Sequence, residues 1–152
     1  MIVSSHSNSY PEANMSVRGL NHITLAVVDL ERSLAFYRDL LGLSLRAIWP
    51  AGAYLEPGSL WLCLSVDPKA ATGPNDDYTH IAFDVDEARF DEFSQRVAAN
   101  APSWRNNRSE GASLYILDPD GHKMELHVGS LESRLAHYRA VKSADMVVFE
   151  AS

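Results

Sequence analysis

Two stretches of this chain begin in the same way, and this duplication constrains the fold more than any other feature of the sequence. One opens with His22-Ile23 and the other with His80-Ile81, and both then alternate towards a valine and an acidic residue. Alternation with period two predicts a strand and places each histidine on the face opposite its isoleucine. A helix-like segment follows each strand, which indicates one module that occurs twice.

The first module covers about residues 19–65. Its opening strand is expected at 22–28, and Asp29 is a good N-cap for the following helix. Apolar residues then recur at helical spacing up to Gly42, which ends the helix. Prolines and glycines separate three further short strands, expected at 43–49, 53–55 and 60–64.

The second module covers residues 78–129 and follows a linker, 66–77, that contains prolines, a glycine and an asparagine. A strand is expected at 78–85, and Asp86 is the N-cap of the next helix. Three more strands are expected at 103–106, 113–117 and 123–128, the last two joined by a tight turn.

Each half therefore has the order β-α-β-β-β, which predicts an α+β fold. Four strands cannot close by themselves, so we expect paired βαβββ modules, from one chain or from two, in a partly closed barrel around a cleft. Residues 1–16 are expected to be a loosely ordered extension, with Met15 an alternative start. Residues 17–138 are expected to be one domain that ends in a helix at 131–138, and 139–152 to be a tail.

Composition excludes several classes of function. The net charge is −7 and the sequence pI about 5.2, which argues against nucleic acid or an anionic membrane surface as partner. Cys63 is the single cysteine, so an intramolecular disulfide is excluded and a reducing compartment, the cytoplasm, is expected. No apolar run approaches the ~20 residues that span a bilayer, and residues 1–16 do not have the pattern of a secretory signal.

His22, His80 and Glu125 are candidate metal ligands. A single histidine on a strand is by default a packed or surface residue, but these two occupy matching positions of the repeat. Glu125 lies between Met124 and Leu126, which are expected to point into the core. A carboxylate that faces a barrel interior is costly unless it is paired or bound to a metal. Two imidazoles and one carboxylate suit Mn²⁺ or a similar ion and leave positions open for substrate.

The loop at residues 105–113 combines two arginines with many oxygen donors. Taken alone, it is typical of a solvated hairpin loop. It also has the composition of an anion site, since guanidinium groups match phosphate or phosphonate oxygens bidentately and serine hydroxyls complete the shell. Its Asn, Ser and Gly oxygens could also hold a monovalent cation. The candidate anion ligands in and near the loop are Arg105, Ser109, Ser113, Tyr115 and Arg134.

Thr24 shares a strand face with His22, where its hydroxyl could bond a substrate oxygen. Threonine is otherwise simply a good strand former. Trp49, Tyr54 and Trp61 are expected to form wall and core rather than to take part in the chemistry.

Several motifs carry a resemblance to a known family over about residues 19–135. They include Phe36-Tyr37-Arg38-Asp39-Leu40-Leu41-Gly42, Asp77-Tyr78-Thr79-His80, Asn107-Arg108-Ser109-Glu110-Gly111 and Asp118-Pro119-Asp120-Gly121-His122. The sequence resembles the vicinal oxygen chelate superfamily and, within it, the fosfomycin resistance glutathione transferases. The turn at 118–122 is shared across the superfamily, whereas the loop at 107–111 is much more specific.

The resemblance implies a domain-swapped homodimer whose active sites are shared between chains, with Mn²⁺ held by His22, His80 and Glu125. It implies glutathione as co-substrate, with Tyr54 near its thiol, and a metal that acts as a Lewis acid on the epoxide of fosfomycin. The family usually has a lysine where this chain has Arg105. The resemblance further implies a K⁺ at Asn107, Ser109, Gly111 and Ser113, and a phosphonate held by Thr24, Ser109, Ser113, Tyr115 and Arg134.

Two other classes of function remain as alternatives. One is another enzyme on the same scaffold, a glyoxalase or an extradiol dioxygenase. The metal triad does not exclude a dioxygenase, but a catechol needs no phosphonate site. The other is a protein that sequesters a drug without catalysis, which has no need of a metal triad. Cysteine or bacillithiol could also replace glutathione as the thiol.

Overall fold

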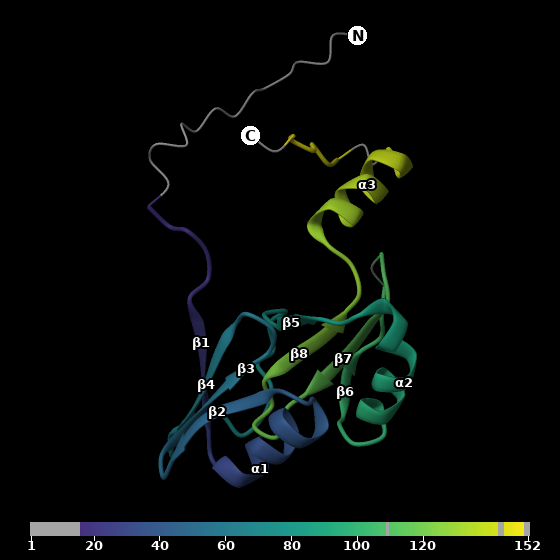
Figure 1. Ribbon diagram of the computed structural model, residues 1–152. Helices are drawn as coiled ribbons and strands as arrows, with labels where there is room; N and C mark the ends of the chain where they lie inside the picture. Colours follow the sequence, from purple (N-terminus) through teal and green to yellow (C-terminus); the bar gives the residue numbers. More distant parts are fainter. Residues whose placement is uncertain (1–15, 109, 143–144, 151–152) are drawn as a thin grey trace. The chain divides into compact units, whose positions relative to one another are not determined.

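The computed structural model describes residues 16–108, 110–142 and 145–150 (Figure 1). The chain divides into two compact units, Leu20–Gly129 and the segments on either side of it. Ser109 and nearly all of the expected N-terminal extension lie outside the described residues.

The larger unit contains two four-stranded sheets with the same topology. The first has the order β1-β4-β3-β2, and the second has the order β5-β8-β7-β6. The outer strand that opens each module pairs in parallel with the last strand of that module, and the other pairs are antiparallel. The predicted duplication is therefore confirmed. Over the described residues of one chain, the two sheets are separate and are not hydrogen-bonded into a closed barrel.

The bounds of most strands agree with the sequence-based expectation to within two residues. In the first sheet they are β1 (His22–Val27), β2 (Ser44–Trp49), β3 (Gly52–Glu56) and β4 (Trp61–Val66). In the second sheet they are β5 (Ile81–Asp84), β6 (Ser103–Arg105), β7 (Ser113–Leu117) and β8 (Lys123–His127).

The first helix differs from the expected single α-helix. Asp29 caps α1 (Leu30–Leu34) by accepting a hydrogen bond from the Arg32 amide, as predicted. The chain then continues as a π-helical segment, η2 (Ala35–Leu40), in which the Leu41 amide donates to the Phe36 carbonyl at 2.9 Å. Both Phe36 and the adjacent Tyr37 are buried, which is consistent with a wider turn that keeps consecutive large residues on one side.

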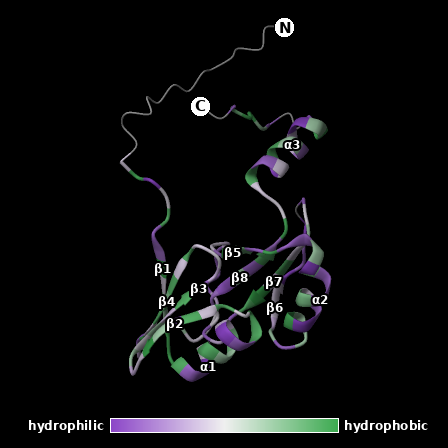
Figure 2. Cartoon of the chain, in the orientation of Figure 1, coloured by the Kyte–Doolittle hydropathy of each residue, from purple (hydrophilic) through white to green (hydrophobic). Residues whose placement is uncertain are grey.

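Helix α2 (Glu87–Ala98) begins after Asp86, whose carboxylate accepts from the Ala88 amide. Helix α1 packs against β4, and α2 packs against β7. Buried hydrophobic residues from both modules form a single core. Figure 2 shows hydrophobic residues in strands of both sheets and in the helices that cover them. The core includes Leu25, Val27, Leu34, Tyr37, Leu55, Leu62, Leu64, Val97, Ile116, Met124 and Leu126.

The second unit contains α3 (Leu131–Val141), which extends past the predicted end at residue 138. Ser130 and Ser133 form a reciprocal capping box at its start. Among the described residues, no helix has the length and the apolar character needed to cross a membrane.

Candidate functional site

His80 and Glu125 lie together, as the sequence predicts. His80 immediately precedes β5 rather than lying in it, because the Asp77 carboxylate accepts from the Thr79 amide and holds the chain in a turn. The Nε2 atom of His80 lies 2.9 Å from Oε2 of Glu125. Glu125 is on β8 between the fully buried Met124 and Leu126, and its own side chain is 8% exposed.

The two ring nitrogens of His80 have different environments. Nδ1 lies 2.8 Å from the Tyr78 carbonyl oxygen, which can only accept, so Nδ1 must carry the proton. In the neutral ring, Nε2 then has a lone pair, and that lone pair faces a carboxylate oxygen. Two acceptors at this distance repel each other unless a cation, a proton or a metal ion, binds to them. Histidines that bind a metal through one ring nitrogen usually donate the N–H of the other to a backbone carbonyl or carboxylate, as His80 does here.

The two oxygens of Glu125 also have different partners. Oε1 accepts a hydrogen bond from the Ser113 hydroxyl at 2.6 Å, and Oε2 faces His80. Burial by itself raises the pKa of the Glu125 carboxyl, but the hydrogen bond that Ser113 donates and the neighbouring imidazoles of His80 and His127, in their protonated form, hold the pKa below its usual value. The carboxylate is therefore ionised at neutral pH, and Oε2 is the oxygen oriented towards the histidine.

An aromatic and cationic wall surrounds this pair in the second module. The rings of Trp104 and Tyr115 have their centroids 5.5 and 6.1 Å from that of His80. The guanidinium carbon of Arg105 lies 4.5 Å from the centroid of Tyr78. The structure thus brings Arg105 and Tyr115, two of the predicted anion ligands, to the same wall as His80 and Glu125.

His22 and the other predicted residues of the first module form a second, separate wall. Nδ1 of His22 lies 2.7 Å from Oδ1 of Asn21, so Nε2 is again the nitrogen left to bind a metal. The His22 ring lies 4.5 Å from Trp61, which contacts Tyr54 at 5.0 Å between centroids. Thr24 is exposed on the same face.

Trp49, Tyr54 and Trp61 are 37%, 36% and 38% exposed, so within one chain they form a wall, as expected, but not a core. They lie on the face of the first sheet opposite the hydrophobic core. This face is polar and aromatic, and His22 lies on it as well.

His22 does not join His80 and Glu125 within one chain. Among the described residues, the only group of three whose ligand atoms lie within 4.8 Å of one another is Asp118, Asp120 and His122. Either the triad assembles from two chains or the sequence-based assignment of His22 is wrong.

The predicted potassium loop is described in part. The side-chain amide of Asn107 donates to the Gly111 carbonyl at 2.9 Å and closes the loop. Gly111 has φ +85°, and a side chain there would meet the Val128 carbonyl oxygen at 2.5 Å, so only glycine fits. Ser109 lies outside the described residues, and Arg134 lies on α3 in the other unit.

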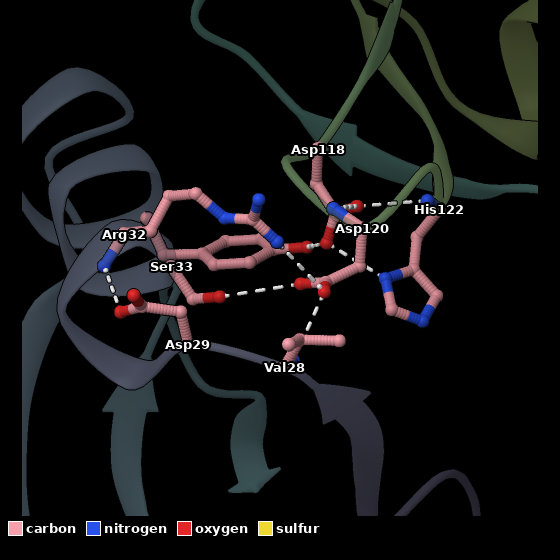
Figure 3. Close-up of polar contacts among 8 residues, drawn as sticks. Val28, Asp29, Arg32, Ser33, Asp118, Asp120 and His122 are labelled. Carbon is pink, nitrogen blue, oxygen red and sulfur yellow. Dashed lines mark hydrogen bonds and ion pairs between the residues drawn. The ribbon is translucent and has the colours of Figure 1, made fainter. Parts of the chain in front are cut away.

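The Asp118, Asp120 and His122 cluster joins the two modules and does not have the character of a metal site (Figure 3). Asp120 accepts from the Val28 amide at 3.0 Å and from Arg32 at 3.1 Å. The donors to Asp118 are the hydroxyl of Tyr37 at 2.7 Å, Nδ1 of His122 at 2.7 Å, and the amides of residues 120 and 122. Because protein donors already occupy these oxygens, the cluster is a structural joint between the modules, where the sequence predicts only a turn.

Residues 19–126 match the glyoxalase/bleomycin resistance protein/dioxygenase superfamily. The chain belongs to this superfamily. Within the superfamily, it is 54% identical over 134 residues to the glutathione transferase FosA of Serratia marcescens, covering 86% of this chain and 95% of that protein. It is 35% identical over 131 residues to the metallothiol transferase FosB of Staphylococcus haemolyticus, covering 83% and 94%.

Solved superfamily structures agree with these sequence relatives. The fosfomycin resistance protein FosX of Listeria monocytogenes, complexed with Mn(II) and sulfate, matches with a TM-score of 0.68 and 32% identity. The match covers 80% of this chain and 98% of that one. The resemblance predicted from the motifs is confirmed.

Proposed function

We propose that this protein is a metal-dependent glutathione transferase that inactivates fosfomycin by opening its epoxide ring. The observation that carries the proposal is the contact between Nε2 of His80 and Oε2 of Glu125, next to a wall that contains Arg105, Ser113 and Tyr115. A metal held by this pair would contact the epoxide of fosfomycin, and the arginine and hydroxyl groups beside it suit the phosphonate of the same molecule. The relationship to FosA supports both the reaction and the thiol.

The metal of this proposal is Mn²⁺, held by His22, His80 and Glu125. Two imidazole nitrogens and a carboxylate oxygen form a suitable donor set for Mn²⁺ and related divalent ions. In both histidines Nδ1 already has a hydrogen-bond partner, which orients the ring and leaves Nε2 for the metal. When bound, the ion acts as a Lewis acid on the epoxide oxygen and the phosphonate. The solved FosX complex with Mn(II) supports the choice of ion.

The protein would act as a homodimer with shared sites. His22 lies on the exposed polar face of the first sheet, while His80 and Glu125 lie on the wall of the second module. If these faces meet across a two-fold axis, each site receives His22 from one chain and the other two ligands from its partner. Such an arrangement also covers the exposed aromatic wall of Tyr54 and Trp61.

The remaining residues would bind and orient the substrates. Positive charge from Arg105 and Arg134, with a K⁺ bound by the loop at Asn107, Ser109, Gly111 and Ser113, would neutralise the phosphonate. Hydroxyl groups of Thr24, Ser109 and Tyr115 would complete its shell, while the proton of Ser113 is donated to Glu125. Tyr54 would lie near the thiol. The thiol gives up its proton, its sulfur bonds to the less hindered ring carbon as the C–O bond of the epoxide breaks, and the resulting alkoxide takes up a proton. Positioning and charge stabilisation would account for most of the rate.

The test is an assay of the purified protein with Mn²⁺, K⁺ and fosfomycin, supplied in parallel with glutathione, cysteine, bacillithiol or no thiol. We expect mass spectrometry to detect the glutathione adduct, and chelation of the metal to abolish it. An adduct with another thiol alone would change the co-substrate. Tight fosfomycin binding with no product under any condition would indicate a sequestering protein and refute the proposal.

A further inference from the structure

The hydroxyl group of Ser113 is bonded on both sides, and only one of its partners is a proposed metal ligand. Ser113 on β7 pairs in register with His127 on β8, and its Oγ lies 2.7 Å from Nδ1 of that histidine. The same Oγ lies 2.6 Å from Oε1 of Glu125. A continuous chain of contacts therefore runs from His127 through Ser113 to Glu125.

The direction of each hydrogen bond follows from counting protons. The hydroxyl has one proton, and an ionised carboxylate can only accept, so Ser113 donates to Glu125. Nδ1 of His127 must then be protonated and donate to Oγ of Ser113. The distance of 3.3 Å between Nδ1 and Oε1 of Glu125 agrees with a donor at this position. The imidazole thus fixes the direction of a hydroxyl that would otherwise rotate.

The His127 ring is itself held in place by the backbone. A side chain at Gly111 would lie 3.0 Å from Cε1 of His127, so the loop packs closely against the ring edge. The side chain of His127 is only 15% exposed. One imidazole therefore contacts both the end of the loop at residues 107–111 and the hydroxyl that holds Glu125.

We propose that His127 is a positioning residue for the metal-binding carboxylate, acting through Ser113. By fixing Ser113, it holds Oε1 of Glu125 and leaves Oε2 oriented towards Nε2 of His80. The metal aspect of this inference rests on the proposed function, whereas the hydrogen-bond chain does not. Outer partners of this kind typically change metal affinity about 10- to 100-fold when removed.

The first experiment uses variants that separate the donor from the shape of the side chain. Asn places an amide N–H near Nδ1, so His127→Asn should bind Mn²⁺ within about threefold of wild type, while the apolar His127→Leu should bind about 10- to 100-fold more weakly. Binding is followed by the electron paramagnetic resonance signal of free Mn²⁺, without any turnover. His137→Leu, on exposed α3, is the matched control and should have no effect.

Equal affinities for His127→Leu and wild type would overturn the proposal, and so would equal losses for the Leu and Asn variants. A double-mutant cycle tests whether His127 acts through Ser113. In the Ser113→Ala background, His127→Leu should have little further effect on Mn²⁺ affinity. Independent, additive losses of Mn²⁺ affinity from the two substitutions would overturn the proposal that His127 acts through Ser113.

A second experiment does not depend on the metal or on activity. In metal-free wild-type protein with ¹⁵N-labelled histidine, at a pH where the ring is neutral, NMR should show His127 protonated at Nδ1 and unprotonated at Nε2. The opposite tautomer would overturn the proposal even if Mn²⁺ binds. If the NMR result is as expected but wild type binds no Mn²⁺, the metal-dependent proposed function fails while the hydrogen-bond chain stands.

Discussion

The guanidinium carbon of Arg105 lies 4.5 Å from the ring centroid of Tyr78 and 5.8 Å from that of Tyr115. A planar guanidinium group stacks on aromatic rings and keeps its N–H groups available in the ring plane, whereas an ammonium group is compact and more strongly hydrated. The family resemblance leads us to expect lysine at this position in related enzymes. The residue in this chain therefore keeps the charge but is held in place by stacking.

Arg105→Lys should raise the KM for fosfomycin about two- to fivefold, which corresponds to the roughly 0.5–1 kcal/mol of an exposed cation–π contact. Steady-state kinetics with glutathione at saturation will measure this change. The charge remains, so kcat should change little. An increase in KM above about fiftyfold would mean that two N–H groups of the guanidinium bind the phosphonate directly.

At the scale of elements, the turn between β7 and β8 joins the two modules. Asp120 accepts from the backbone amide of Val28, just after β1, and from the guanidinium group of Arg32 in α1, while Asp118 accepts from the Tyr37 hydroxyl in η2. These contacts connect residues that are 81 to 92 positions apart in the chain. The turn therefore contributes to the stability of the pairing between modules as well as to the local hairpin.

Tyr37→Phe removes the hydroxyl that donates to Asp118 and leaves a buried carboxylate oxygen with one donor fewer. A hydrogen bond to a charged group contributes about 1.5–3 kcal/mol, so the free energy of unfolding should fall by about that amount. Urea denaturation provides the measurement. Tyr138→Phe on α3 serves as control and should change stability by less than about 0.5 kcal/mol. Equal effects of the two substitutions would contradict the role of the joint.

The pair formed by His122 and Asp118 should make stability depend on pH. The hydrogen bond with Asp118 raises the pKa of His122 above its ordinary 6.5. The contribution of His122 to the free energy of unfolding is therefore complete below pH 6.5 and is lost as pH rises through the folded pKa. Burial by itself raises the pKa of Asp118, but the bonds from His122 and Tyr37 lower it below 3.8. The contribution of Asp118 to the free energy of unfolding is present above pH 3.8 and is lost as pH falls through the folded pKa.

The pair should therefore stabilise the fold most between pH 3.8 and 6.5. We expect the difference in unfolding free energy between wild type and His122→Gln to be largest in this interval and to shrink on both sides. Urea titrations from acid to mildly alkaline pH will show it. A difference that stays constant across this range would exclude an ionic contribution from the pair.

At the scale of the whole molecule, the separation of His22 from His80 and Glu125 can be tested by complementation. His22→Ala and Glu125→Ala homodimers should both be inactive. In a mixed dimer with shared sites, one site carries both lesions and the other carries none. Random association makes about half of the dimers mixed, so co-expression should restore about a quarter of wild-type activity. If every ligand comes from one chain, no activity returns.

Local patterns alone were sufficient to predict much of this protein. Period-two alternation, the N-caps Asp29 and Asp86 and the glycine stop at Gly42 depend on neighbouring residues, so the two modules and most strand bounds followed from the sequence. The proximity of His80 to Glu125 was also predicted, and the parallel pairing of β5 with β8 in the second sheet accounts for it. The family assignment rested on motifs of the same local kind.

Only the tertiary structure decided the features that depend on distant residues. The change to π-helical hydrogen bonding at Ala35–Leu40 accompanies the burial of Phe36 and Tyr37, which local propensity does not report. The Asp-x-Asp-x-His spacing at 118–122 was visible in the sequence, but three of its donors, on Val28, Arg32 and Tyr37, come from the other module.

The roles of individual atoms in the site were likewise decided by tertiary contacts. The alternation that puts His127 on the same face as Glu125 was also visible, but its contact with Ser113 required the register between β7 and β8. Which nitrogen of His80 faces the carboxylate depended on the Tyr78 carbonyl. Sequence patterns specify which side of an element a residue occupies, whereas proton positions and ligand atoms are set by groups that only folding brings within hydrogen-bonding distance.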